Sequence, residues 1–459
     1  MLDIHNVVRE LKAYQRFMMP PEGENMYRLM SFRVLIFWCS YFIYLIATVF
    51  QTTMYNYNSD LFRVFVTLRY ISFAGAGIKI VLDLLEQYLK DRKEGQQFFK
   101  WDYDSVLCAV KYFVIFGLLF IVSMIADERS LLFVFAFLLA SKGISENKIF
   151  QYTFYVQVAL SIFVVFCSSV GLLPDLLFER GGNYIRHALG YIYPSVAFNY
   201  FFFIIVLKFW SQKKRIELKE AFLLELINFL LFLLTDVSTG FLVVSLIILI
   251  EVINEKKHIL HADSIFIKKI QSYKRISSVL SNIYDYFAVY LVLILVVLCS
   301  TIQYRPTQII NTLLTSRIQL VVDAVKKYGI HWFGNNIEWI GFGGNPDANS
   351  FEGIYNFIDC SYASIILNYG IVVFVGIMVL LVLVGKDLRK KRHYDKCFLY
   401  FVVLAYCFIE PRLIELQANT LLFLMAPLMY SRPPRVKKYK KKDGIFYKKA
   451  IRLRDRRKI

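Results

Sequence analysis

Apolar stretches long enough to cross a bilayer recur along nearly the whole chain, from Ser31 to Ser431, and this feature constrains the fold more than any other. A membrane-spanning helix needs roughly 20 consecutive apolar residues, because the hydrocarbon core of a bilayer is about 30 Å thick. The composition agrees, since 57% of the residues are hydrophobic and only 19% are charged. We therefore predict an all-α polytopic membrane protein with no room for a large soluble domain.

Charged or turn-rich breaks divide the apolar stretches into about 12 predicted transmembrane helices. The fourth, seventh and eleventh are short, so a re-entrant hairpin could replace one pair. The predicted spans are residues 31–51, 64–82, 105–125, 129–142, 150–173, 188–209, 221–235, 238–254, 285–303, 358–385, 396–410 and 413–430.

Lys and Arg are distributed unevenly over the connections between these spans. Both chain ends and alternate connections carry 42 of the 54 Lys and Arg residues, whereas the other connections carry nine. Cytoplasmic segments are enriched in Lys and Arg, so we predict that the first set, including both termini, is cytoplasmic. The last 29 residues alone hold 14 of these cations, which explains most of the net charge of +19 without nucleic acid. The predicted units are a helical bundle over 1–430 and a basic cytoplasmic tail over 431–459.

Two connections on the opposite, extracytoplasmic side are longer than the rest, about 304–356 and 173–187. Long loops in a compact bundle are usually functional, so we look for chemistry in these two.

The large loop contains apolar residues at helical spacing between positions 314 and 325, which predicts a short amphipathic helix. Ser316 and Gln319 have the spacing of a capping box, and Gly329 has the place of a C-terminal stop. Arg317 would then lie in the first turn, where the helix dipole disfavours a cation. A bound phosphate would resolve this conflict; so would plain solvation, or a pairing with Asp323.

The smaller loop carries Arg180, Arg186 and His187 beside a Gly-Gly pair. Two guanidinium groups at a membrane face could clamp a pyrophosphate, because a guanidinium fork matches phosphate oxygens. Contact with lipid headgroups is the competing interpretation.

A sugar hydroxyl that attacks a glycosyl donor needs a general base. His187 and His331 are the outward-facing histidines and are rival candidates, and the sequence does not choose between them and the carboxylates of the same side. Those carboxylates are Asp175, Glu179, Asp236, Glu338, Asp347, Glu352, Asp359, Glu410 and Glu415.

Ionisable residues also fall inside the predicted spans. Arg69 is expected to face a partner or a cavity, and Lys79 and Asp83 have the spacing of an ion pair on one helix face. Motifs of nucleotide and metal chemistry are missing: the sequence has no Walker A loop and no HExxH, and its one DxD-like pair, Asp102 with Asp104, lies on the cytoplasmic side. We therefore expect no metal and no cofactor.

Four stretches carry a resemblance to a known family: RHALGYIYPS (186–195), TDVSTGFL (235–242), TSRIQLVVDAVKKYGIHWFGNNIEWIG (315–341) and FIDCSYASIILNYGI (357–371). In these stretches and in its overall topology the chain resembles the Wzy-type polysaccharide polymerases of the O-antigen ligase/polymerase superfamily.

The resemblance implies a GT-C-like bundle in a bacterial plasma membrane that transfers glycan on the outer face. Its substrates would be oligosaccharide repeat units on undecaprenyl diphosphate, joined into capsular polysaccharide, exopolysaccharide or O-antigen chains without a metal. Membrane lipids, a chain-length regulator and a flippase of the same pathway are the implied partners.

The arginines that handle acidic substrates in the family correspond here to Arg186 and Arg317, and Asp359 and Tyr362 match the motif after the large loop. Arg317, Arg186 and Asp359 are our predicted catalytic residues. The predicted substrate-contacting residues are Arg180, His187, His331, Glu338, Tyr362 and Asp236.

The chain departs from the family pattern in two places. Relatives often have an arginine in the turn that corresponds to Thr235–Gly240, where this chain has Val237 and Ser238. The family's arginine-to-glycine spacing is only approximated by Arg317 and Gly334.

Two other functions compete with a polymerase. A ligase of the same fold, which moves finished glycan to another acceptor, would rely on an outer-loop histidine such as His331. A lipid-linked oligosaccharide flippase would favour charged residues lining the spans and short outer loops, and the large loop counts against it.

Overall fold

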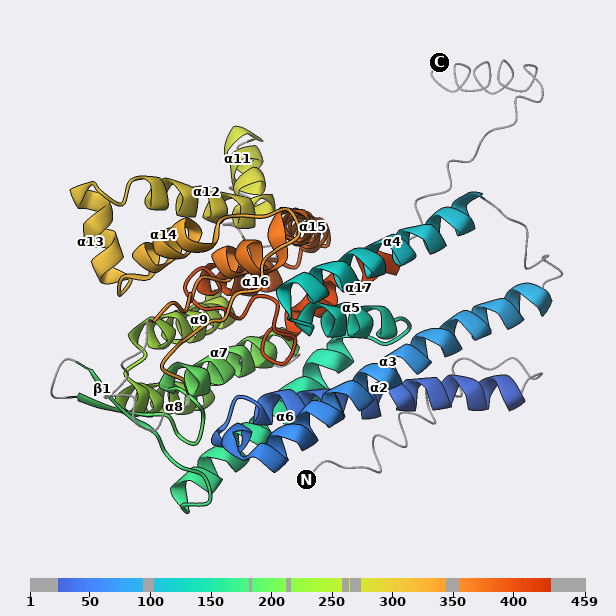
Figure 1. Cartoon of the computed structure of the whole chain (residues 1–459), viewed down its shortest axis with the longest axis horizontal. Coiled ribbons are helices and arrows are strands. Elements are labelled where there is room, and N and C mark those ends of the chain that lie inside the picture. The colour runs from blue at the N-terminus through green and yellow to red at the C-terminus, as the bar shows by residue number, and fades with distance from the viewer. Residues whose placement is uncertain are drawn as a thin grey trace.

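The computed structural model describes residues 24–93, 103–180, 184–211, 216–257, 264, 274–343 and 355–430, and these are mostly helical (Figure 1). The predicted basic tail over 431–459 lies outside the described residues, as do Asp102, Asp347 and Glu352.

The long helices coincide with predicted spans, because their continuous apolar sequences satisfy every backbone group internally. They are α2 (Glu24–Phe50), α3 (Ser59–Lys93), α4 (Tyr103–Ala126), α6 (Glu146–Ser169), α7 (Pro194–Ser211), α8 (Leu218–Thr235), α9 (Ser238–Lys257) and α15 (Ser361–Lys390). The shorter elements are η1 (Met54–Tyr57), α5 (Ser130–Ala140), α11 (Lys274–Asp285), α12 (Phe287–Ser300), α13 (Arg305–Leu313), α14 (Arg317–Tyr328), α16 (Tyr394–Tyr406), η3 (Thr420–Met425) and α17 (Ala426–Tyr430).

Within the described residues, six helices are long and apolar enough to cross a membrane. A seventh span results if α11 and α12, which meet at a bend of 73°, count as one. Large apolar side chains remain exposed on the outside of the bundle, such as Phe113 at 80% and Phe222 at 71%, as expected for surfaces that face lipid. The chain is therefore a helical membrane protein. The six long spans lie in α2, α3, α6, α7, α9 and α15.

The last predicted span, 413–430, is wrong as a single helix. Residues 407–419, here called the irregular segment, form turns, and η3 and α17 follow. Its carbonyl groups are satisfied by side chains from elsewhere: Gln157 Nε2 donates to Gln417 O at 2.6 Å, and Ser361 Oγ donates to Glu410 O at 2.6 Å. Non-helical backbone is tolerated at such a place because it is buried in protein.

The smaller predicted loop contains strands, which the sequence analysis did not predict. Strands β1 (Leu177–Arg180) and β2 (Tyr184–His187) pair antiparallel, with Phe178 opposite Arg186. This β-hairpin packs through Phe178 and Ala188 against Phe342 of the large loop. The two long loops therefore contact each other.

Helix α15 is broken at Gly370, which has φ 80° and ψ 175°. Segment 331–335 of the large loop fills the break: Ile371 N donates to His331 O at 3.0 Å, and Val372 N donates to Trp332 O at 3.2 Å. On the other side of the break, Asn335 N donates to Asn368 O at 3.2 Å. The large loop is thus hydrogen-bonded into a membrane helix.

Figure 1 shows α2 and α3 side by side at one edge of the molecule, with α12, α13 and α14 at the other edge. Helices α15 and α16 lie between these groups, and α16 contacts α7 and α9. Arg317 begins α14, and the irregular segment follows α16. In this arrangement Arg317 contacts the irregular segment at Ile409.

Candidate functional site

Arg317, the first residue of α14, lies at the centre of a cluster of charged residues. Its Nε lies 3.0 Å from Asp359 Oδ2, and its Nη2 lies 3.1 Å from Glu410 Oε1. A third contact is the hydrogen bond that Nη1 donates to Ile409 O. The side chain remains 20% exposed. The alternative pairing with Asp323 is wrong, because Asp323 instead accepts a hydrogen bond from Gln319 at 2.8 Å.

Helix α14 confirms the predicted amphipathic helix, with Ile318, Val321 and Val322 buried. The predicted C-terminal stop is also confirmed, since Gly329 has φ 69° at the C-cap. The capping box is wrong, because Ser316 has φ 63° and makes no side-chain cap hydrogen bond.

Glu410 fixes the position of Arg317. Its side chain is 2% exposed and accepts a hydrogen bond from Asn199 Nδ2 at 2.8 Å. Asn199 in turn accepts a hydrogen bond from the Tyr406 hydroxyl. An ionised carboxylate at this depth is stable only when it is paired and hydrogen-bonded, and here both requirements are met.

Asp359, two residues before α15, is the more accessible carboxylate on Arg317, with its side chain 23% exposed. Burial raises the pKa of Asp359 to about 6, although Arg317 lowers it, and the neighbouring Glu410 raises it further. For Arg317 itself, burial lowers the pKa, but the charges of Glu410 and Asp359 outweigh burial, so the net pKa is raised. Arg317 is therefore permanently charged between two acids.

Arg186 lies in β2 and is also held in place. Its Nε donates to Thr235 O at 2.8 Å, Nη1 donates to the Tyr193 hydroxyl at 3.3 Å, and the guanidinium lies 5.4 Å from the centre of the Tyr193 ring. At 9% exposure it is turned inward rather than toward lipid headgroups. The turn that follows α8 at Thr235 is thus contacted by Arg186 from the hairpin.

Tyr355 belongs to the large loop. Its ring stacks on Phe342 at 4.7 Å, and Phe342 in turn packs against the β-hairpin that carries Arg186. Burial raises the pKa of Tyr355, Asp359 and Tyr193 raise it further, and Arg317 opposes them.

Comparisons with protein-family models, with curated proteins and with solved structures give no match.

The remaining predicted site residues have other partners. His187 Nδ1 lies 2.6 Å from Asp175 Oδ2, and His331 Nε2 lies 2.9 Å from Tyr328 O. Tyr362 is 1% exposed and donates its hydroxyl hydrogen bond to Leu404 O at 3.0 Å, so it is a core residue.

Three other residues were predicted to contact substrate: Asp236, Glu338 and Arg180. Asp236 is the C-cap of α8 with φ 49°, Glu338 is exposed, and Arg180 is placed only by its backbone pairing with Tyr184. Among the described residues, no group of three or more His, Cys, Asp and Glu side chains is arranged to hold a metal ion.

The irregular segment also belongs to the site, although from the sequence only Glu410 and Glu415 of this segment were named, as two of several candidate carboxylates. Besides Glu410 it supplies Arg412, whose Nη1 donates to both carboxylate oxygens of Glu415 at 2.8 and 2.7 Å. Glu415 also accepts a hydrogen bond from Gln417 Nε2 at 3.1 Å. Three charged residues at the junction of two predicted spans, Glu410, Arg412 and Glu415, were the signal that could have marked the segment.

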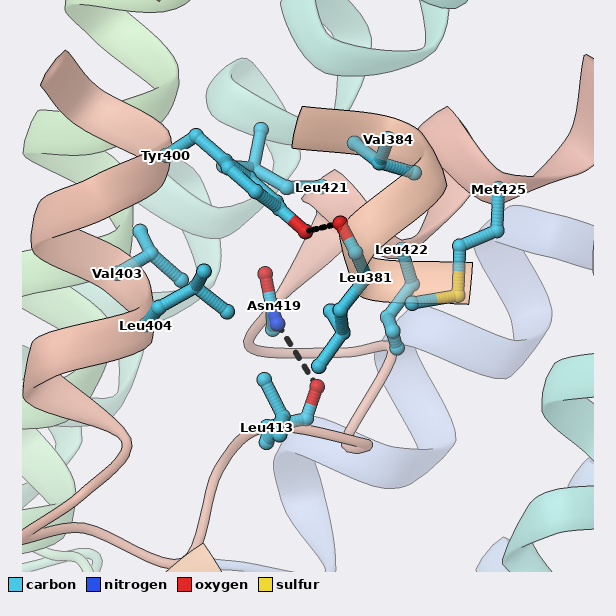
Figure 2. A pocket seen from close by; sticks show the side chains of 10 residues that line it. All are labelled: Leu381, Val384, Tyr400, Val403, Leu404, Leu413, Asn419, Leu421, Leu422 and Met425. Atoms are coloured by element: carbon cyan, nitrogen blue, oxygen red, sulfur yellow. Dashed lines mark hydrogen bonds between the residues drawn. The ribbon is translucent and has the colours of Figure 1, made fainter. Parts of the chain in front are cut away.

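A small pocket lies beside the irregular segment, where α15, α16 and η3 meet (Figure 2). Figure 2 shows the Tyr400 hydroxyl bonded to Leu381 O and the Asn419 amide bonded to Leu413 O. The pocket has room for about one water molecule, so it is far too small for a sugar. Its lining residues are Leu381, Val384, Tyr400, Val403, Leu404, Leu413, Asn419, Leu421, Leu422 and Met425.

Ionisable residues inside the spans have partners as expected. Arg69 Nη1 donates to Gln51 at 2.9 Å. Lys79 is 1% exposed, pairs with Asp83 and donates to Lys142 O at 2.6 Å. Arg33 joins them, 2.8 Å from Asp83. This second buried group, Arg33, Lys79 and Asp83, is separate in sequence from the Arg317 cluster.

Proposed function

We propose that this protein is a metal-independent glycosyltransferase of the Wzy type, which joins undecaprenyl-diphosphate-linked oligosaccharide repeat units on the outer face of a bacterial plasma membrane. The proposal includes about 12 spans, both termini in the cytoplasm, and a chain-length regulator and a flippase as pathway partners. Capsular polysaccharide, exopolysaccharide or O-antigen would be the product.

The observation that carries the proposal is the setting of Arg317. Glu410, Ile409 and Asp359 hold the guanidinium, while 20% of the Arg317 side chain stays exposed. A cation held in advance in this way can meet an anion without further reorganisation. Arg186, in the β-hairpin that packs against the large loop, is a second guanidinium, buried against Thr235 and Tyr193.

This arrangement suits a diphosphate leaving group. As the bond between the donor sugar and phosphate breaks, negative charge gathers on the phosphate oxygens, and guanidinium groups stabilise that charge more strongly than they stabilise the bound donor. Bidentate guanidinium–phosphate contacts also orient the group. The apolar polyprenyl chain would remain among the lipid-facing side chains of the bundle.

The direct test uses the purified protein in nanodiscs with undecaprenyl-diphosphate-linked repeat units. We expect a ladder of longer glycans together with released undecaprenyl diphosphate, and no ladder from Arg317→Ala. Arg305→Ala is the matched control, because Arg305 begins the adjacent helix α13 and is exposed. Absence of a ladder from the unmodified protein would refute the proposal.

In cells, deletion of the gene separates the polymerase from the ligase of the same fold. A polymerase deletion leaves single repeat units on the lipid, whereas a ligase deletion leaves long chains on undecaprenyl diphosphate. The structure describes His331, the residue that favours a ligase, as exposed and bonded to Tyr328 O.

A lipid-linked oligosaccharide flippase is the second candidate, and the buried charges of Arg33, Lys79 and Asp83 favour it. Movement and length of a labelled lipid-linked unit, measured in vesicles with and without the protein, distinguish a flippase from a polymerase. A flippase would move a labelled lipid-linked unit across the bilayer and would leave its length unchanged.

A further inference from the structure

We propose that Asp359 is the general base of this reaction, accepting the proton of the attacking sugar hydroxyl. The inference rests on the proposed function. In the step, the acceptor hydroxyl oxygen forms a bond to the anomeric carbon of the donor, and the bond from that carbon to phosphate breaks. Undecaprenyl diphosphate leaves with the electron pair, and the hydroxyl proton passes to the Asp359 carboxylate.

Exposure and the occupation of the carboxylate oxygens together separate Asp359 from Glu410 and Glu415. Glu410 is 2% exposed and is occupied by Arg317 and Asn199, so no hydroxyl can reach it. Glu415 is 27% exposed, but Arg412 and Gln417 take its oxygens. Asp359 is 23% exposed, and Arg317 is its ion-pair partner within the described part of the chain.

Charged and titratable groups from three segments act on Asp359: Arg317 of α14, Glu410 and Arg412 of the irregular segment, and Tyr355. Burial and Glu410 favour its protonated form, whereas the two arginines favour its charged form. Its resulting pKa of about 6 leaves the carboxylate mostly ionised at neutral pH and basic enough to take a proton during the reaction.

The ion pair also links substrate binding to base strength. When a diphosphate takes up the charge of Arg317, Asp359 loses its nearest stabilising cation and gains a nearby anion. Both changes raise the pKa of Asp359 and make it a stronger base at the moment of transfer. The proton acceptor thus becomes more basic only when a donor is in place.

The first test is the pH dependence of polymerisation by the purified protein in nanodiscs. A base must be ionised, so kcat/KM, which reports the free enzyme, should fall as pH drops through about 6. Asp359→Asn should lower kcat by about 100-fold or more and abolish this acid limb. Asp359→Glu should restore part of the activity together with a shifted limb.

Asp323→Asn is the matched control, because Asp323 is an exposed carboxylate on α14 and bonds only to Gln319 among the described residues. It should keep both the rate and the limb. Two outcomes would overturn the role of Asp359 as the base: an acid limb that persists in Asp359→Asn, or an unmodified protein that forms ladders without an acid limb. Neither outcome would contradict the proposed polymerase function.

The second test measures binding of undecaprenyl diphosphate itself, which needs no chemistry. Asp359→Asn should bind it at least as tightly as the unmodified protein, because a competing carboxylate has been removed from Arg317. Arg317→Ala should bind it more weakly. Equal losses of binding in both variants would show that Asp359 only positions Arg317, and would reject it as the base.

Discussion

The carboxyl group of Glu410 lies where water is nearly excluded, since its side chain is 2% exposed. A buried carboxylate costs several kcal/mol in desolvation unless partners replace the lost water. Arg317, Asn199 and the hydroxyl of Tyr406 behind Asn199 supply those partners. The same network that stabilises the acid therefore fixes the guanidinium at the surface.

Glu410→Gln keeps the shape of the side chain and removes its charge. We expect a loss of about 1–3 kcal/mol in the free energy of unfolding, because Arg317 loses a charged hydrogen-bond partner and keeps Asp359. Thermal unfolding in detergent measures the loss, with Asp323→Asn as the exposed control. An unchanged unfolding temperature would show that Glu410 contributes little to the network.

Arg186→Lys tests the second guanidinium. Lysine cannot donate to Thr235 O while it also stacks on Tyr193, because its ammonium is a compact point charge. We expect the KM for lipid-linked donor to rise roughly tenfold, the equivalent of one charged hydrogen bond. Arg305→Lys should leave KM unchanged. Equal KM values for all three proteins would remove Arg186 from donor binding.

The break in α15 joins the large loop to a membrane helix. Gly370 has a φ of 80° with a ψ of 175°, a conformation essentially confined to glycine, and a Cβ there would lie 2.5 Å from Trp332 O. The segment 331–335 is hydrogen-bonded at this break, and Asp359 lies two residues before the same helix. The position of the site therefore depends on the shape of one helix.

Gly370→Ala should lower the free energy of unfolding by at least about 2 kcal/mol, because the alanine is both strained and too close to the loop. Gly376 provides a matched control in the same helix, since a Cβ there meets nothing within 4 Å. Gly376→Ala should be neutral or stabilising by up to about 1 kcal/mol. Equal thermal stability of the two variants would show that the contact between segment 331–335 and the break in α15 does not depend on Gly370.

Elements with a strong periodic or continuous apolar pattern could be predicted from the sequence. The long spans and the amphipathic helix α14 are examples, since their local sequence alone determines where the apolar side chains lie. The hairpin β1–β2 and the irregular segment could not, because both depend on contacts with distant residues such as Phe342 and Gln157. The capping box failed because Ser316 adopts φ 63°, a conformation that the spacing of two residues does not encode.

At the scale of the whole molecule, the distribution of Lys and Arg predicts the orientation. Alkaline phosphatase, which is active only outside the cytoplasm, should be active when fused after Gly329 and inactive when fused after Arg392. Green fluorescent protein at the same positions should give the opposite pattern. Phosphatase activity at Arg392 would reverse the proposed topology and would place the Arg317 cluster on the cytoplasmic side.

The sequence brought Arg186, Arg317 and Asp359 forward from charge bias and resemblance, and the structure places Arg317 directly on Asp359. Glu410 was one of the candidate carboxylates that the sequence could not rank, and Asn199 and Tyr355 could not be selected in the same way. Their roles arise from α7, the large loop and the irregular segment meeting in space, over separations of up to 211 residues. Such a meeting leaves no local pattern in the sequence.

The irregular segment has a consequence for the order of assembly. The chain is made from its N-terminus, so Arg186 and Arg317 enter the membrane before Glu410 has been synthesised. Until the segment around Glu410 packs between α7 and α15, Arg317 lacks the partner that orients it. The Arg317 cluster is therefore completed late in synthesis, and a nascent chain that ends before residue 407 does not yet contain it.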